Sequence, residues 1–129
     1  MKEDFINYLK CFIGSRYQWT GEGPYNVGFD CSGFVLEGLR SIGYWGKDDA
    51  TAQNIFNKFA KIRGDKPQAG DLLFFGHDIN NITHIGVAIN TYQYIEAGGG
   101  DSKTTDKGMV RIRRQDYRKD LLTHLTIFQ

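Results

Sequence analysis

The segment that decides the fold reads Gly28-Phe29-Asp30-Cys31-Ser32-Gly33-Phe34-Val35. It joins a glycine-rich stretch to a run rich in apolar residues that continues to Ile42, where Gly43 provides a natural end for a helix. The pattern predicts a helix that begins at Asp30–Cys31 and runs to about Ile42. Its apolar residues leave little polar face, which is typical of a helix surrounded by other elements.

Cys31 is the residue of this segment that can carry chemistry. A cysteine in the first turn of a helix lies among unpaired backbone N–H groups at the positive end of the helix dipole. Both features favour the thiolate over the thiol. A cysteine that opens an apolar helix is nevertheless most often an inert, buried thiol. A functional interpretation of Cys31 therefore needs a second group of polar residues.

That second group lies in two segments that otherwise read as buried strands. His84 is near the start of residues 83–89, and Glu96 lies within residues 94–97. Burying either side chain is costly unless it has a partner. A three-residue hairpin loop at residues 89–91 makes His84 and Glu96 cross-strand neighbours on one face, whereas a two-residue loop puts them on opposite faces.

In the first of these registers, the three residues form the Cys–His–carboxylate relay of a cysteine peptidase. Cys31 is then the nucleophile that attacks an amide carbon. His84 carries the proton, and Glu96 orients the ring and stabilises the imidazolium.

The remaining elements predict an α+β fold, in which N-terminal helices pack on a C-terminal antiparallel sheet. Apolar spacing predicts helices at about residues 3–13 and from Asp48 or Asp49 to about Phe59, with a long structured loop at residues 15–30. Short β-rich segments follow at residues 72–75, 84–89, 92–97, 110–113 and 122–128. We expect one domain spanning residues 1–129.

Composition excludes several classes of protein. The chain has 129 residues, 40% of them hydrophobic and 24% charged, which is enough for a packed core. Its net charge of +1 argues against nucleic-acid binding, and it has no apolar run of ~18 residues that could span a membrane. Two cysteines are too few for a disulfide scaffold, and we expect Cys11 to be a packed free thiol. His77 and Asp78, taken with Asp71, match no common zinc pattern, so we expect neither a metal nor another cofactor.

Four motifs together resemble the NlpC family of cell-wall cysteine peptidases, over about residues 5–128. They are Tyr17-Gln18-Trp19, Asp30-Cys31-Ser32-Gly33, Gly70-Asp71-Leu72-Leu73-Phe74-Phe75 and His84-Ile85-Gly86. The resemblance implies a compact papain-like α+β fold. It also implies hydrolysis of an amide bond in peptidoglycan stem peptides, typically between D-glutamate and the following diamino acid.

The resemblance also implies roles for individual residues. It makes Cys31 the nucleophile, His84 the general base and Glu96 the third polar residue. It places Tyr17 in the active site, where its hydroxyl can donate to the oxyanion. Asp30 and Ser32 flank the nucleophile and help to shape the site and its substrate contacts.

Two positions depart from the family pattern. The third polar residue is most often histidine in the family, and here it is Glu96. A carboxylate should raise the pKa of His84 and favour a thiolate–imidazolium pair, so we expect activity to survive. The usual Trp-Gly-Gly is replaced by Trp19-Thr20-Gly21, a change that falls in the loop before the nucleophile.

Alternative functions remain open at this point. The same triad could serve a related amidase, acyltransferase or secreted toxin-type hydrolase, and the domain could instead be a catalytically silent module that binds cell wall. The start Met1-Lys2-Glu3-Asp4 does not resemble a signal peptide. We therefore expect a protein made in the cytoplasm that reaches the wall by lysis, on a phage virion or through a secretion machine.

Overall fold

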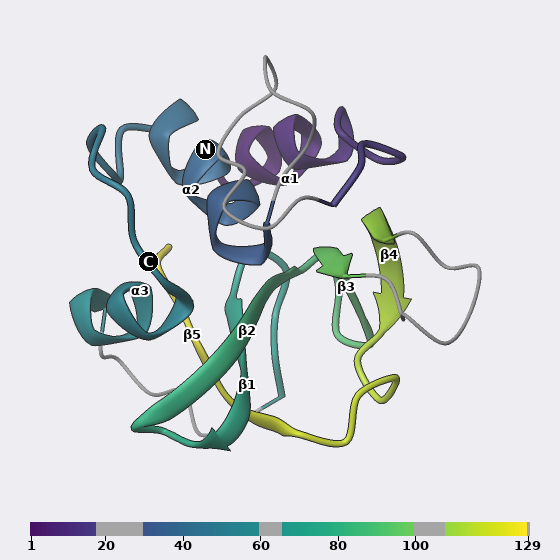
Figure 1. Cartoon of the computed structure of the whole chain (residues 1–129). Coiled ribbons are helices and arrows are strands. Elements are labelled where there is room, and N and C mark those ends of the chain that lie inside the picture. Colours follow the sequence, from purple (N-terminus) through teal and green to yellow (C-terminus); the bar gives the residue numbers. More distant parts are fainter. Residues whose placement is uncertain (18–29, 60–65, 100–107, 129) are drawn as a thin grey trace.

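The computed structural model describes residues 1–17, 30–59, 66–99 and 108–128, in which three helices are followed by five strands (Figure 1). The helices are α1 (Lys2–Lys10), α2 (Cys31–Ser41) and α3 (Ala52–Phe59). The strands are β1 (Leu72–Asp78), β2 (Asn81–Ala88), β3 (Gln93–Gly99), β4 (Gly108–Arg114) and β5 (Leu121–Leu125). This order confirms the predicted α+β class.

The helix that carries Cys31 begins where the sequence predicts, but α3 begins later than Asp48 or Asp49. The reason is a reciprocal cap before its first residue. The Thr51 hydroxyl accepts a hydrogen bond from the Asn54 backbone N–H, and the Asn54 side chain accepts one from the Thr51 N–H, both at 3.1 Å. This exchange satisfies two backbone groups that a helix start leaves unpaired, and it fixes the start of α3.

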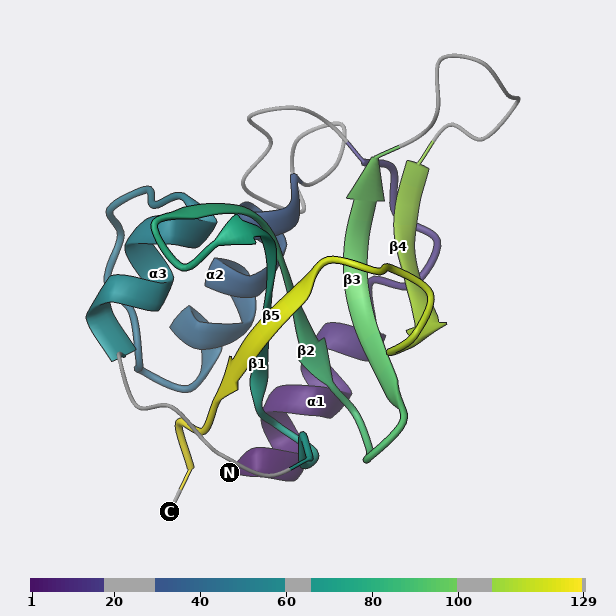
Figure 2. The same cartoon turned by 90° about the horizontal axis from the view of Figure 1, so that it is seen from below.

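The strands form an antiparallel sheet in the order β4-β3-β2-β1-β5 (Figure 2). β1 pairs along most of its length with β2 and β5, and β3 pairs with β4 over seven positions. In contrast, β2 and β3 are paired at two positions, Val87–Ile95 and Ala88–Tyr94. Figure 2 shows these two strands diverging beyond that point, on the side where α2 begins.

The observed register corrects the three-residue loop at residues 89–91. Ala88, the last residue of β2, lies opposite Tyr94, and β3 begins at Gln93, so the connection spans residues 89–92. The Asn90 side chain fixes this longer turn by accepting hydrogen bonds from the backbone N–H groups of Tyr92 (3.0 Å) and Gln93 (2.7 Å). The register therefore differs from the expected one by two residues. A shift of two leaves every side chain on its face, so His84 and Glu96 still share one face of the sheet.

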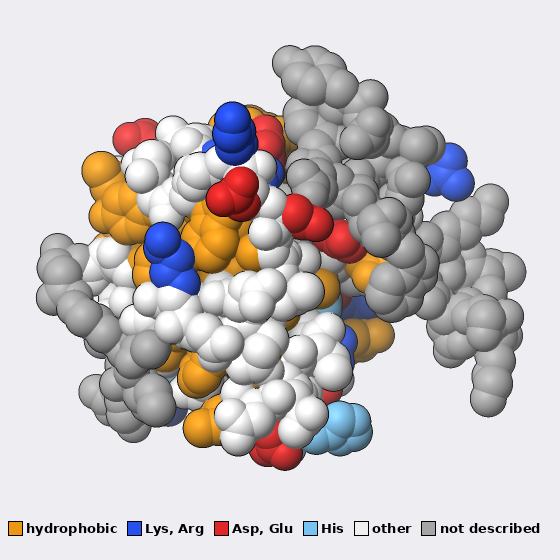
Figure 3. Space-filling model, turned by 60° about the vertical axis from the view of Figure 1, so that its left-hand side comes forward, with side chains coloured by type: hydrophobic (Ala, Val, Ile, Leu, Met, Phe, Trp, Pro, Cys, Tyr) orange, Lys and Arg blue, Asp and Glu red, His pale blue; other side chains and the backbone are white. Residues whose placement is uncertain are grey.

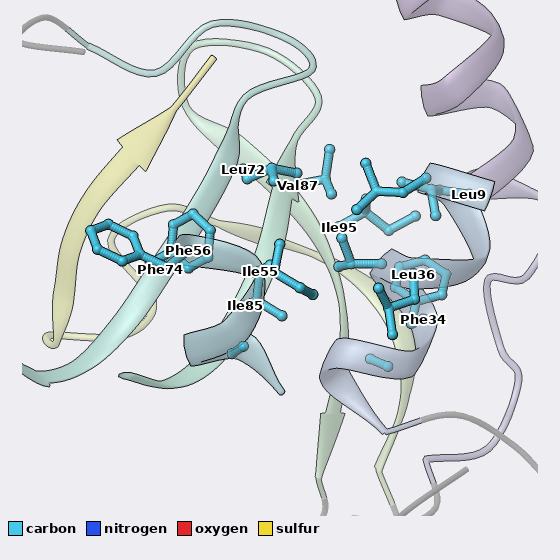
Figure 4. Packing of buried hydrophobic residues seen from close by; sticks show 14 of the residues in the cluster. Leu9, Phe34, Leu36, Ile55, Phe56, Leu72, Phe74, Ile85, Val87 and Ile95 are labelled. Carbon is cyan, nitrogen blue, oxygen red and sulfur yellow. The ribbon is translucent and has the colours of Figure 1, made fainter. Parts of the chain in front are cut away.

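The main core lies between the helices and one face of the sheet (Figure 4). Ile55 and Phe56 of α3 pack near Ile85 and Phe74, while α2 contributes side chains beside β3, including Phe34 and Leu36 near Ile95. A smaller core on the opposite face consists of four fully buried residues, Leu73, Phe75, Ala88 and Tyr94. The site residues His84 and Glu96 belong to this second face.

Helix α1 packs on α2 and helps to hold the nucleophile helix in place. The contact is centred on Gly38, where an added Cβ would lie 2.7 Å from a Leu9 methyl carbon and 2.8 Å from the Phe5 ring. The two helices approach so closely because residue 38 has no side chain. The apolar face of α2 is thus fixed from two sides, by α1 and by the sheet.

The surface agrees with the small net charge. On the face seen in Figure 3, acidic and basic side chains are interspersed among hydrophobic ones. Within the described part of the chain, no helix is long and apolar enough to cross a membrane.

Candidate active site

Cys31 is the first residue of α2, and Asp30 is the cap that starts this helix. The Asp30 backbone is extended (φ −87°, ψ 176°), and its side-chain Oδ1 accepts a hydrogen bond of 2.6 Å from the Gly33 N–H. This satisfies one of the unpaired N–H groups of the first turn. The Cys31 side chain is half-buried, and it lies at the positive end of the helix dipole, as predicted.

His84 lies on β2 with its ring buried against the ring of Phe75, at 5.3 Å between centroids. Its Nε2 is 2.7 Å from Glu96 Oε1. A carboxylate can only accept, so Nε2 carries the proton and Nδ1 is the nitrogen free to take a proton from a thiol. His84 reaches Glu96 diagonally across the diverging strands, because both side chains are long enough to cover the two-residue offset.

The electrostatics of His84 tie it to Cys31 as well as to Glu96. Burial by itself would lower the pKa of His84. Hydrogen bonding to Cys31 and to Glu96, with the negative charges at both, outweighs burial, and the pKa of His84 is raised above its ordinary value. The predicted rise in this pKa is confirmed. The structure therefore brings the three residues of the expected relay together.

Glu96 is an ionised carboxylate in a buried position. Its side chain is 4% exposed, and burial alone would raise its pKa. The contact with His84, the neighbouring Tyr94 hydroxyl and the charge of Arg113 lower the pKa of Glu96 below its ordinary value. Arg113 Nε lies 3.6 Å from Glu96 Oε2, so the two carboxylate oxygens have different partners.

Tyr17 lies beside these groups. Its N–H donates to the Gly108 carbonyl (3.3 Å), next to an isolated bridge between Arg16 and Met109. Burial raises the pKa of the Tyr17 hydroxyl, and the negative charges of Cys31, Asp30 and Glu96 raise it further. Because all three charges act on its hydroxyl, Tyr17 belongs to the same site. The raised pKa means that this hydroxyl keeps its proton at neutral pH.

Comparison with known proteins agrees with this arrangement. The sequence profile of the NlpC/P60 family matches residues 14–124, which include each residue of the candidate site. The chain belongs to the NlpC/P60 family. The expected family resemblance is therefore confirmed over most of the chain.

Two curated relatives of the NlpC/P60 chain carry the names of peptidases. It is 36% identical over 89 residues to a gamma-D-glutamyl-L-lysine dipeptidyl-peptidase of Bacillus subtilis, covering 67% of this chain and 29% of that protein. It is 37% identical over 80 residues to the bifunctional muramidase/DL-endopeptidase CwlT of the same organism, covering 60% of this chain and 23% of that protein. The chain thus spans less than a third of the length of these relatives.

Solved structures match the whole NlpC/P60 fold. An NlpC/P60 family protein of Bacillus cereus superposes with a TM-score of 0.80 at 23% identity, covering 100% of this chain and 41% of that one. The NlpC/P60 domain of the peptidoglycan hydrolase SagA gives a TM-score of 0.76 at 23% identity, covering 98% and 99%. At this identity the likeness shows that the fold is shared.

The two residues that flank the nucleophile have different surroundings. Asp30 caps the helix, so it fixes the position of Cys31 through the backbone. Ser32 is 9% exposed and lies in the first turn of α2. Their expected substrate contacts stay a prediction. Trp19, Thr20 and Gly21, where the family pattern changes, fall outside the described residues.

Several other residues lie apart from the site. Cys11 is exposed rather than packed, because the chain leaves α1 at Lys10 and its thiol donates to the Asn7 carbonyl at 3.4 Å. Asp71 and His124 form a buried contact of 3.2 Å that ties the start of β1 to β5. Among the residues the structure describes, no three side chains of the metal-ligating types gather into a group that could hold an ion.

Sequence reasoning did not single out Arg113. The alternation of Val110 and Ile112 with Arg111 and Arg113 does show that both arginines share a face. Their partner depends on the pairing of β3 with β4, in which Glu96 lies opposite Arg111 and Tyr94 opposite Arg113. That pairing is not visible in the sequence.

Proposed function

We propose that the chain is a cysteine endopeptidase that hydrolyses an amide bond in peptidoglycan stem peptides, between D-glutamate and the following diamino acid. The observation that carries the proposal is the buried His84, whose Nε2 is held by Glu96 and whose pKa is raised by Cys31 at the start of α2. A nucleophile, a base and an orienting carboxylate in this order are the requirements of acyl transfer through a thiol.

The reaction begins when His84 Nδ1 takes the proton of the Cys31 thiol. The thiolate attacks the amide carbon, a C–S bond forms, and the carbonyl oxygen becomes an oxyanion. Backbone N–H groups at the start of α2 and the Tyr17 hydroxyl are the donors available to that oxyanion. As the intermediate collapses, the C–N bond breaks and the leaving amine takes the proton from the His84 imidazolium.

Hydrolysis of the thioester completes the cycle. His84 Nδ1 removes a proton from a water molecule, which attacks the acyl carbon. The C–S bond then breaks, the acyl group leaves as a carboxylic acid, and Cys31 regains its proton from His84. Throughout both halves Glu96 accepts the Nε2–H, so the imidazole ring keeps one orientation.

The bond specificity is supported by the relatives rather than by geometry. One Bacillus subtilis relative is named for the gamma-D-glutamyl-L-lysine bond, and the other carries the name DL-endopeptidase. Both names describe peptidases, and the first specifies a bond between D-glutamate and a diamino acid. We infer the same substrate class for this chain.

Mass spectrometry of fragments released from purified cell wall tests this proposal. The native chain should release peptides with a newly formed D-glutamate carboxyl end and a matching free amine, and Cys31→Ala should release none. Cys11→Ala is the matched control and should retain full activity. Cleavage of a different bond would refute the proposed specificity. Equal binding to cell wall by the native chain and Cys31→Ala, with no fragments released by either, would indicate a silent binding module.

A further inference from the structure

Glu96 shares its two carboxylate oxygens between two partners. Oε1 is 2.7 Å from His84 Nε2, and Oε2 is 3.6 Å from Arg113 Nε. The second contact is an ion pair rather than a hydrogen bond. Arg113 Nε is buried and has no hydrogen-bond partner among the described residues. A small approach of the guanidinium toward Oε2 would therefore give Arg113 Nε a hydrogen-bond partner.

Arg113 is itself held in place. Its Cα lies opposite Tyr94 in the β3–β4 register, and Tyr94 is two residues from Glu96 on the same face of β3. Its guanidinium lies over the ring of Tyr117, at 3.9 Å from the centroid, and its side chain is 22% exposed. Stacking on an aromatic ring restricts the planar group and keeps the cation beside Glu96.

Gly98 provides the space that the carboxylate occupies. A Cβ added at residue 98 would lie 2.5 Å from Glu96 Oε2 and 3.2 Å from Glu96 Cδ. The first distance is too short for any real contact, and the carboxylate would have to leave its position. The carboxylate of Glu96 thus folds over a residue without a side chain.

We propose that Arg113 is a positioning residue that holds Glu96 as the charged partner of His84, in a space that Gly98 keeps open. The proposal deepens the function proposed above and rests on it. Glu96 and Arg113 together are neutral, so the charge of His84 is left to pair with the thiolate of Cys31. Without the cation, the buried carboxylate would either share a proton with the imidazole or pair with the imidazolium in place of the Cys31 thiolate.

Charged groups reach this cluster from every element around it. They are Tyr17 in the segment after α1, Asp30 and Cys31 at the start of α2, His84 on β2, Tyr94 and Glu96 on β3, Arg111 and Arg113 on β4, and Arg118 and Asp120 in the segment before β5. Arg118 is already bonded to Asp120 through two contacts of 2.8 Å. Arg113, which forms the ion pair with Glu96, is therefore the group to change.

NMR titration of His84 and Glu96 in a Cys31→Ala background tests the proposal without requiring activity. Removing a cation should raise both pKa values, so Arg113→Met should shift each upward by about one pH unit, a tenfold change in proton affinity. Arg113→Lys should give a smaller shift. Arg114→Met, an exposed neighbour paired with Asp116, is the matched control and should shift neither.

Gly98→Ala should change His84 in the opposite direction. The displaced carboxylate no longer raises the His84 pKa, so this pKa should fall. Gly46→Ala, where an added Cβ meets nothing within 4 Å, is the matched control. The proposal is overturned if Arg113→Met titrates like Arg114→Met, or if Arg111→Met gives the larger shift.

Activity provides a separate readout in the chain that retains Cys31. Arg113→Met should lower kcat roughly tenfold with little change in KM, and the acid limb of its pH profile should move to higher pH. A native chain that releases nothing from cell wall would refute the proposed function. The NMR titration would still decide the role of Arg113.

Discussion

Replacing Glu96 by Gln removes one charge from a buried contact while keeping its shape. The His84–Glu96 bond is 2.7 Å long, and the two side chains are 8% and 4% exposed, so water does not compete for it. A hydrogen bond to a charged group contributes about 1.5–3 kcal/mol, against about 0.5–1.5 kcal/mol for a neutral one. The whole contribution of the charged hydrogen bond is lost if the Gln amide turns its NH₂ toward Nε2, because an NH₂ group cannot accept the Nε2–H.

That range corresponds to a roughly 10- to 100-fold loss in kcat for Glu96→Gln. Turnover of cell-wall peptides should fall while KM stays nearly constant, because Glu96 acts on His84 rather than on the substrate. The acid limb of the pH profile should also move to lower pH, since Glu96 raises the pKa of His84. Glu96→Ala should lose more activity than Glu96→His, which retains an acceptor.

Thermal unfolding provides the control for these variants. Glu96→Gln conserves volume, so its unfolding midpoint should stay within about five degrees of the native value. Wild-type turnover in Glu96→Ala would refute the reasoning, because an orienting carboxylate cannot be removed without effect. A loss of activity that simply followed a loss of folded protein would assign Glu96 to stability instead.

Three further outcomes are expected. Iodoacetamide at pH 6.5 should alkylate the half-buried Cys31 faster than the exposed Cys11, as followed by peptide mass spectrometry, and equal rates would contradict the assignment of the nucleophile. Tyr17→Phe should lower kcat by about 10²–10³ with little change in the unfolding midpoint, and wild-type turnover would leave the oxyanion to backbone N–H groups alone. The lowered pKa of Glu96 adds stability that is lost as pH falls through its folded value. The raised pKa of His84 adds stability that is lost as pH rises through its folded value. In urea unfolding, the stability difference between the native and Glu96→Gln chains should therefore be largest between these two pKa values and should shrink as pH falls through the pKa of Glu96, and a constant difference would contradict the linkage.

The start of α2 could be predicted because its signals are local. Asp30 accepts from the Gly33 N–H three residues later, and the apolar run that follows has the spacing of a buried helix. The position of Cys31 therefore follows from a few neighbouring residues. The start of α3 is also local, but two candidate caps stand close together, and the Thr51–Asn54 exchange decides between them.

The register of β2 and β3 could not be predicted because it depends on a turn with several acceptable lengths. Asn90 accepts hydrogen bonds from two backbone N–H groups and fixes a connection of four residues, 89–92. The pairing of β3 with β4 is harder still to predict, because residues 100–107 separate the two strands in the sequence. The contact of Arg113 with Glu96 could not be predicted for that reason, although the alternation with Ile112 shows on which face of the strand Arg113 lies.

The contact between His84 and Glu96 was nevertheless predictable, and the reason explains why glutamate can stand at this position. Side chains alternate between faces, so a register error of two residues changes the distance along the strand but not the face. A flexible side chain with two acceptor oxygens can then cover the offset and serve two donors at once. A neutral imidazole has one acceptor nitrogen, so a histidine at position 96 could accept from His84 but could not also pair with Arg113. The carboxylate, the arginine and the glycine at position 98 therefore form one interdependent arrangement in this chain.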